Sequence, residues 1–318
     1  MKVNLEVVPE FALAFLEELR EKGKKESTIT RYYRDLLTFF NWLLEERKEI
    51  TYEAWESLDL GEYEKFHDDK EGKYSSSMGT TISSLLKFHG LEIDGIQSIL
   101  KSTGTRQLQK KDFVTEQEVQ KLLKTMSSRK VLTENQLKAF PFLSNRNRAI
   151  VYLFYRYGLR ITEITRINME DINFAQHELA VKDGDGSKRI IKLDHEHQQI
   201  IRRYYKEDIP KPVRPYEYSK HPLFVAFDFE RQTFRWNYES NAPKRLGVKA
   251  IQKMMKQEVE RAGLRKGVSG LSMRNTCILQ KMNEGKETEE LQEYFGLRNP
   301  LSLWRYEKYI ENKKNPSV

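Results

Sequence analysis

The chain has 318 residues, enough for two domains of ordinary size, each with its own core. It carries 55 Lys and Arg against 47 Asp and Glu, and the formal net charge of +8 favours an anionic partner such as nucleic acid. No apolar run approaches the roughly 18 residues of a membrane span, and the first residues lack a secretory signal, so we expect a cytoplasmic protein. The single cysteine, Cys277, excludes an internal disulfide and a cysteine-based zinc site.

The first part of the chain predicts a helical domain. Apolar residues from Phe11 to Leu19 recur at helical spacing before Gly23, and a second helix is expected to open after Ser27 or Thr28. The start and flank of this second helix carry basic and hydroxyl side chains: Lys24, Lys25, Thr28, Arg31 and Arg34. One of its faces is therefore expected to pack on the core, and another to be basic.

A polar segment separates this domain from the rest of the chain. Residues 102–111 have no apolar period and are the best candidate for a linker, so we place the boundary there and predict domains at 1–108 and 109–318. Thr115 and Glu118 then form a capping box of the Thr-x-x-Glu type, which predicts the start of a new helix.

The second domain combines helices with a β-hairpin. A strongly apolar helix at 149–157 ends at Gly158, and residues 178–193 read as two strands joined by the turn 183–186. The rest of this domain predicts mainly helix. The expected fold is therefore mainly α (α+β), with two domains and a small β-sheet in the second.

The order of motifs around Gly158 carries a family resemblance. Gly158-Leu159-Arg160-Ile161-Thr162-Glu163 lies between the apolar helix and the hairpin, and Thr28 to Phe39 matches a Thr-x-x-x-Tyr-x-x-x-Leu-x-x-Phe pattern. In these features the chain resembles the tyrosine recombinase (phage integrase) family over nearly its whole length. The resemblance implies a helical core-binding (SAM-like) domain and a catalytic-like domain that clamp duplex DNA. It also implies that Arg160 is the first catalytic arginine and that the hairpin holds the catalytic lysine.

The closing motifs supply the other residues of the resemblance. The segment around Arg274 matches the family's His-x-x-Arg-His-Thr box, which makes Arg274 its second arginine. The last helices match the family's helix, Gly-His pair and tyrosine, so Tyr306 stands at the place of the nucleophile. Leu271 and Leu297 occupy the two positions where the family has histidine.

These two leucines change what the site can do. In the family, a tyrosine oxygen attacks a DNA phosphate held by two arginines, and protons must leave the tyrosine and reach the departing sugar oxygen. Leucine neither donates nor accepts a proton, and the last histidine of the chain is His221, so no nearby shift of the alignment restores either residue. We therefore expect Arg160, Lys182, Arg274 and Tyr306 to be a vestigial set that grips DNA without cutting it.

The identity of the hairpin lysine stays open. Lys182 precedes the turn and Lys188 follows it, whereas the family's Gly-Lys-Gly-x-Lys-x-Arg turn has a lysine inside, where this chain has Asp183 and Asp185. Aspartates at this tip are expected to repel a phosphate backbone. The two lysines either contact the minor groove or are simply solvated.

Each candidate also has a purely structural interpretation. Arg160 can be a solvated residue at a helix end, Arg274 can form a salt bridge with a neighbour, and Tyr306 can pack in an apolar cluster. The basic residues near the N-terminus can likewise be a solvated helix face, although the resemblance implies that they contact DNA. The same two interpretations apply to a basic edge near the C-terminus, which consists of Arg298, Arg305, Lys308, Lys313 and Lys314. His195 and His197 lack further metal ligands and are expected on the surface, and no metal or cofactor is assigned.

The leading hypothesis is a sequence-specific transcriptional regulator that binds operator-like sites in double-stranded DNA and self-associates there. The chain has the motif order of an integrase but lacks both histidines. In this combination it is similar to the recombinase-fold repressors of SPbeta-type Bacillus phages, which favours a phage or prophage lysogeny repressor. One alternative is an active tyrosine-type site-specific recombinase with an atypical active site. Another is an accessory or architectural factor that assists a separate recombinase.

Overall fold

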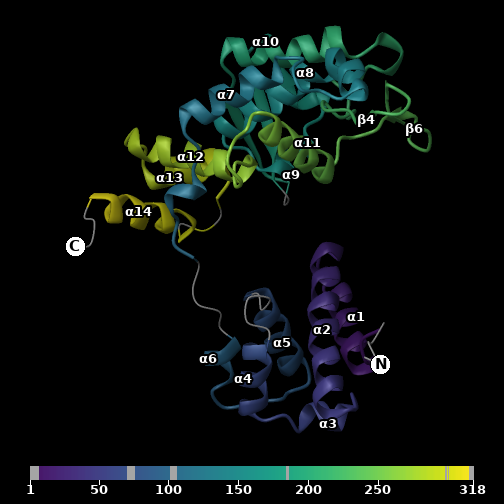
Figure 1. Ribbon diagram of the computed structural model, residues 1–318, viewed down its shortest axis with the longest axis vertical. Coiled ribbons are helices and arrows are strands. Elements are labelled where there is room, and N and C mark those ends of the chain that lie inside the picture. Colours follow the sequence, from purple (N-terminus) through teal and green to yellow (C-terminus); the bar gives the residue numbers. More distant parts are fainter. Residues whose placement is uncertain are drawn as a thin grey trace. The chain divides into compact units, whose positions relative to one another are not determined.

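The computed structural model describes residues 7–69, 76–100, 106–183, 186–297, 299 and 301–314. The chain divides into two compact units, Met1–Arg106 and Gln107–Val318, and each has its own hydrophobic core. As the sequence predicts, both are mainly helical, and small antiparallel sheets occur in the second (Figure 1). Within the described ranges, no helix combines the length and the apolar character that crossing a membrane requires.

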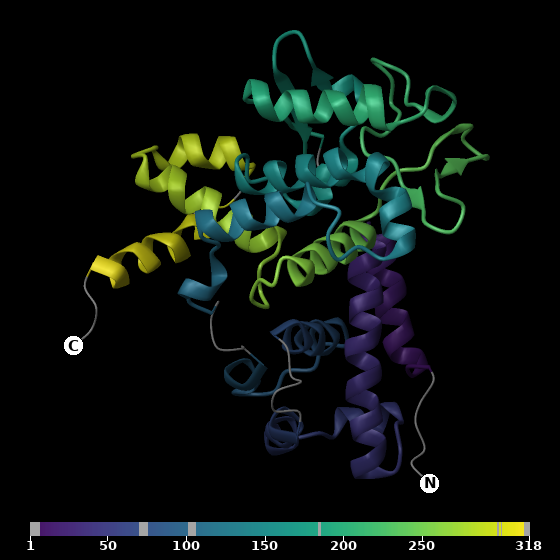
Figure 2. The ribbon, with the colours of Figure 1, turned by 45° about the horizontal axis from the view of Figure 1, so that its top comes forward.

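The first unit is a bundle of helices around an aromatic core. Its described helices are α1 (Glu10–Glu21), α2 (Glu26–Arg47), α3 (Tyr52–Glu56), α4 (Leu60–Asp69), α5 (Ser76–Phe88) and α6 (Ile96–Leu100). α1 lies beside α2 in both views (Figures 1 and 2). Helix α2 begins two or three residues before the predicted start, because the Lys25 carbonyl already accepts hydrogen bonds from the amides of Thr28 and Ile29. Phe39 and Phe40 of α2 are fully buried.

The second unit is built on a long helix, α8 (Glu134–Tyr155), which packs against α10 (His195–Arg203) and α12 (Gly270–Asn283). Around this frame lie α7 (Glu116–Met126), α9 (Ile161–Arg166), α11 (Val248–Arg261), α13 (Thr288–Phe295) and α14 (Leu301–Lys314). Short 3₁₀ or π turns occupy Lys110–Asp112, Met169–Asp171, Tyr204–Asp208 and Lys211–Val213. The predicted capping box opens α7: the Thr115 hydroxyl accepts from the Glu118 amide, and the Glu118 carboxylate accepts from the Thr115 amide.

The predicted hairpin is present as part of a three-stranded antiparallel sheet. Its strands are β1 (Ile172–Asn173), β2 (Glu178–Lys182) and β3 (Lys188–Lys192), in the order β1-β2-β3. In this register Val181 faces Arg189 and Lys182 faces Lys188. Two further two-stranded sheets form where the sequence predicts mainly helix: β4 (Phe227–Asp228) with β5 (Thr233–Phe234), and β6 (Trp236–Asn237) with β7 (Ala242–Pro243). Strands of two residues carry no readable alternation, so only their packing in the fold defines them.

Three further expectations need correction. The apolar helix predicted at 149–157 corresponds to the last part of α8, which begins at Glu134, continues through Pro141 and ends at Tyr155. His197 is buried, with 7% of its surface exposed, because its ring packs at a tilt against Tyr152 and hydrogen bonds to the Tyr157 hydroxyl. The predicted linker contains a buried core residue, Leu108, at 6% exposure, while its residues 102–105 lie outside the described part of the chain.

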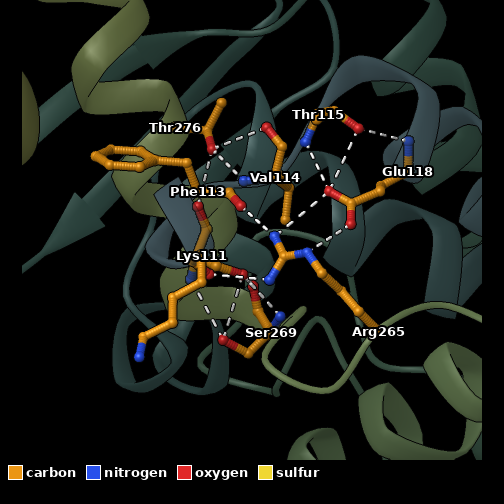
Figure 3. Close-up of polar contacts among 9 residues, drawn as sticks. Lys111, Phe113, Val114, Thr115, Glu118, Arg265, Ser269 and Thr276 are labelled. Carbon is orange, nitrogen blue, oxygen red and sulfur yellow. Dashed lines mark hydrogen bonds and ion pairs between the residues drawn. The ribbon is translucent and has the colours of Figure 1, made fainter. Parts of the chain in front are cut away.

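Arg265 ties the entry of the second unit to the loop after α11 (Figure 3). Its guanidinium donates to the carbonyls of Lys111 and Phe113 and to the Glu118 carboxylate. On the other side of the same segment, the Thr276 hydroxyl of α12 accepts from the Val114 amide at 2.8 Å. These contacts fix the position of α12, the helix that also carries Arg274.

Candidate active site

Arg160 is held at the start of α9 by Glu163. Arg160 is the N-cap residue: its amide donates to Glu163 Oε2 at 2.6 Å, and its Nη1 donates to Oε1 at 2.7 Å. Its Nη2 donates to the Gly296 carbonyl at 2.9 Å, and its side chain remains 35% exposed. A guanidinium fixed in this way and still reached by solvent is suited to contact an anion.

Arg274 lies beside Arg160 but is almost fully buried. It extends from the first turns of α12, donates to the carbonyls of Gly158 and Phe295, and is 7% exposed. Burial, followed by the charge of Arg160, lowers the pKa of Arg274 to about 10. Arg274 therefore remains cationic at neutral pH, and its fit against carbonyl oxygens holds it rigidly.

A third arginine, Arg189 of β3, completes the cluster and was missed in the sequence. Its Nε donates to the Tyr294 carbonyl at 2.8 Å, its Nη2 lies 3.0 Å from Glu163, and its side chain is 8% exposed. The sequence did contain a signal for Arg189, because this residue stands next to the position of the arginine in the family's Gly-Lys-Gly-x-Lys-x-Arg turn. Burial alone would raise the pKa of Glu163, but the hydrogen bond from Arg189 and the other nearby arginines hold it below its ordinary value.

Asp183, at the end of β2, faces the arginines. Its Oδ1 lies 3.6 Å from Arg160 Nη1 and 3.8 Å from Arg189 Nη1, with 20% of the side chain exposed. Its position follows from the turn, because the Asp183 amide donates to the Ser187 carbonyl and the Gly186 amide donates back to Asp183. Asp183 thus adds a carboxylate beside the exposed arginine. Asp185 lies outside the described residues.

Tyr306 is buried in α14 and engaged by an amide. Its hydroxyl donates to Asn275 Oδ1 at 2.8 Å, and 6% of its surface is exposed. Burial raises the pKa of Tyr306, although Arg305 and Arg274 oppose the rise. Tyr306 also belongs to a small apolar core with Phe295 and Leu303, so the packing role expected as an alternative is present.

The two leucines have different surroundings. Leu271 is 68% exposed and lines an open cavity of about 1130 Å³, together with Arg160 and Arg274. Leu297 is partly buried and packs against the small core that contains Tyr306. Neither side chain offers a proton donor or acceptor beside the arginines.

The hairpin lysines do not join the cluster of arginines. Lys182 Nζ lies 2.7 Å from both Glu170 Oε1 and Asp171 Oδ1. Hydrogen bonds to Asp171 and then Glu170 raise the pKa of Lys182, so this ammonium holds its proton more tightly than a free lysine does. Lys188 is exposed at the start of β3.

Several predicted DNA contacts lie on exposed surface. Lys24 and Lys25 precede α2, and Arg31 and Arg34 are exposed on its first turns, where Thr28 is partly exposed. No ion pair within 4 Å involves these four basic residues among the described parts of the chain. On α14, Lys313 is exposed, Lys308 lies 4.0 Å from the Trp304 ring centroid, and Arg305 is partly buried. Arg298 lies outside the described residues, as does the Lys314 side chain.

Comparison with known proteins places this arrangement in a family. The model of the phage integrase family matches residues 112–313, a range that includes the three arginines and Tyr306. The chain belongs to the phage integrase family. It is 24% identical over 298 residues to the tyrosine recombinase XerD of Lacticaseibacillus casei, covering 92% of this chain and 91% of that protein. It is 25% identical over 277 residues to the XerD of Listeria innocua serovar 6a, covering 87% and 86%.

Solved structures support the phage integrase fold. The XerH site-specific recombinase, in its pre-cleavage complex with a difH substrate, matches 96% of this chain and 84% of its own, with 15% identity and a TM-score of 0.63. A lambda integrase dimer bound to a COC' core site matches 91% of this chain and 94% of its own, with 13% identity and a TM-score of 0.62. At these identities the likeness establishes the fold alone.

Proposed function

We propose that this phage integrase family member recognises specific sites in duplex DNA and regulates transcription there without cutting the strand. The observation that carries the proposal is the composition of the site: Arg160 and Arg274 lie side by side, but leucine stands at both histidine positions. Family membership, the DNA held by the XerH and lambda integrase structures, and the exposed basic start of α2 support the DNA partner.

The groups around Tyr306 support the proposed absence of proton transfer. An attacking phenolate requires a base, and burial has raised the pKa of Tyr306, which makes that base more necessary. The Tyr306 hydroxyl donates to the Asn275 amide oxygen, which is not basic enough to take the proton. Lys182, with its raised pKa and two carboxylate partners, is a poor acid for the departing sugar oxygen.

Phosphate binding does not depend on proton transfer. Arginine keeps its charge at all physiological pH values and can hold two phosphate oxygens at once. A chain that retains Arg160 and Arg274 therefore keeps its affinity for the backbone, while base-edge and shape readout supply the site preference. The similarity to recombinase-fold repressors of SPbeta-type Bacillus phages favours a phage or prophage lysogeny repressor as the regulator, acting at operator-like sites in the cytoplasm.

An active recombinase is the second candidate. The names of the relatives favour it over the repressor: each of the two aligned relatives described above is called a tyrosine recombinase, and the alignments cover most of both chains. Tyr306 and both arginines stand at the positions that the family uses. An accessory factor that binds the site of a separate recombinase remains a third candidate, with the same DNA contacts.

A covalent-adduct assay separates the first two candidates. A genomic footprint supplies the cognate site, and a nicked duplex of that site traps any tyrosyl-phosphate intermediate. We expect retardation of the duplex without a denaturant-resistant adduct, for the native chain and for Tyr306→Phe alike. An adduct that forms with the native chain and disappears with Tyr306→Phe would establish cleavage and defeat the proposal.

A promoter-reporter assay then separates regulator from accessory factor. If the footprint lies at several promoters and the chain lowers expression from them, the regulator is supported. A footprint at one attachment-like site, with no effect on the reporter, would favour the accessory factor.

A further inference from the structure

A second cavity, of about 660 Å³, lies away from the arginine cluster. The first half of α8, the first turns of α11 and the strand segments around β4 and β7 line it. Its walls combine aromatic and aliphatic side chains with basic ones, including Phe140, Phe227, Phe229, Arg146, Arg245 and Lys253. A volume of this size is typical of sites that enclose a small molecule.

The unusual feature of the cavity is Arg146, a buried cation without a counter-ion. Arg146 is 4% exposed, and no carboxylate lies within 4 Å of it in the described parts of the chain. Its Nη1 donates to the Val225 carbonyl at 3.1 Å, while Nε and Nη2 share the Asn147 Oδ1 at 3.3 and 3.2 Å. A guanidinium has five N–H groups, so these three bonds leave one N–H on each terminal nitrogen for another acceptor.

Burying the Arg146 guanidinium costs free energy unless an opposite charge compensates for the hydration that it loses. Burial lowers the pKa of Arg146, which reports the loss of hydration by the cation. Charged side chains are seldom buried without a partner, because a buried ion loses its solvation and needs a counter-charge to recover it. An anion in the cavity would supply that counter-charge.

The remaining charges of the cavity favour an anion as well. Lys244, Arg245 and Lys253 line it without an ion pair within 4 Å among the described residues. The lining contains one acidic residue among those described, Glu258, and its carboxylate is engaged by Arg261 at 2.5 Å. The described lining therefore carries more basic than acidic side chains, and of these the Arg245 guanidinium donates to the carbonyls of Thr165 and Ile167.

We propose that this cavity binds a small organic anion, with its carboxylate, sulfonate or phosphate at Arg146 and an apolar body against Phe140, Phe227 and Phe229. The lining combines aromatic walls with basic groups, which suits an anion that has an apolar body better than a duplex, whose backbone presents phosphates without one. The site is separate from the arginine cluster: Gln252 and Lys256 of α11 line the cavity beside Arg160, whereas Lys253 and Gln257 line this one.

Fluorescence titration of the full chain tests the site, with 8-anilinonaphthalene-1-sulfonate as the probe and uncharged N-phenyl-1-naphthylamine as its matched control. We expect saturable binding of the sulfonate at one site, at least tenfold tighter than that of the uncharged probe. Arg146→Met should abolish the difference. Lys256→Met, on the opposite flank of α11, removes the same charge beside the other cavity and should leave it unchanged.

A second variant keeps the test valid if Arg146→Met fails to fold. Ala250 lines the cavity from an exposed position on α11, so the larger side chain of Ala250→Trp would occupy part of the space for the ligand and leave Arg146 in place. This variant should weaken sulfonate binding by about the same factor as Arg146→Met. Equal binding of the two probes overturns the proposal, as does sulfonate binding that survives both Arg146→Met and Ala250→Trp. No DNA enters this measurement, so its outcome is independent of the proposed function.

Discussion

The Asp183 carboxylate lies 3.6 Å from Arg160 Nη1, so the exposed arginine of the cluster already faces an anion supplied by its own chain. Asp183 packs so closely that a Cβ on Gly296 would come within 2.7 Å of its Oδ2. A DNA phosphate that reaches Arg160 must therefore displace this carboxylate or share the guanidinium with it. In both cases Asp183 opposes phosphate binding.

Asp183→Asn should therefore bind duplex DNA more tightly. Exposed ion pairs are worth up to about 1 kcal/mol, so removing this carboxylate should give up to roughly a fivefold gain in affinity. Fluorescence anisotropy at several salt concentrations measures it, with the largest gain at low salt. Glu293→Gln, an exposed change of the same charge on α13, controls for net charge, and an equal gain in that variant would remove the special role of Asp183.

Gly158→Ala should be strongly destabilising. Gly158 has a φ of +62°, and an added Cβ would lie 2.5 Å from the Phe295 ring and 3.3 Å from Cys277 Sγ. Gly285→Ala is the matched control, since its φ is +79° but nothing lies within 4 Å. Both changes bear the left-handed backbone cost, so urea unfolding should show a loss at Gly158 that exceeds the loss at Gly285 by about 2 kcal/mol. Similar losses would mean that Phe295 shifts freely.

Stability should depend on pH through Asp208. Burial raises the pKa of Asp208 to about 6 from an ordinary value of 3.8, and Asn145 only partly opposes this. Ionisation is therefore less favourable in the folded chain than in the unfolded one, and the wild type loses stability as the pH rises from about 4 to about 6. Asp208→Asn should be more stable at pH 7 by up to about 3 kcal/mol, and the gain should vanish below pH 4. A gain independent of pH would contradict this origin.

The basic start of α2 should determine part of the salt dependence of DNA binding. Arg31 and Arg34 are exposed and have no ion pair in the described residues, so each is free to contact a phosphate. Each phosphate contact contributes about 0.9 to the slope of log affinity against log salt, so Arg31→Ala with Arg34→Ala should reduce the slope by about 2. Lys65→Ala provides a control, because Lys65 already pairs with Glu46. An unchanged slope would exclude this face of α2 from the interface.

The sequence alone determined the features that depend on neighbouring residues. The capping box from Thr115 to Glu118 and the hairpin from Glu178 to Lys192 each form within a few residues, so their patterns suffice. The order of the motifs likewise indicated the family that the comparisons confirm, and both leucines were visible in the sequence.

Only the tertiary structure decided what surrounds these residues. Arg189 is fixed by the Tyr294 carbonyl, 105 residues away, and Tyr306 donates to Asn275 in another helix. Arg146 donates to the Val225 carbonyl, 79 residues away. Burial and charge pairing are set by segments that meet through the fold, and no local pattern encodes which carboxylate or carbonyl will face a given arginine. The sequence therefore determined that the site has Arg160, Arg274 and leucine at both histidine positions, and the fold decided that Arg189 and Asp183 lie beside them.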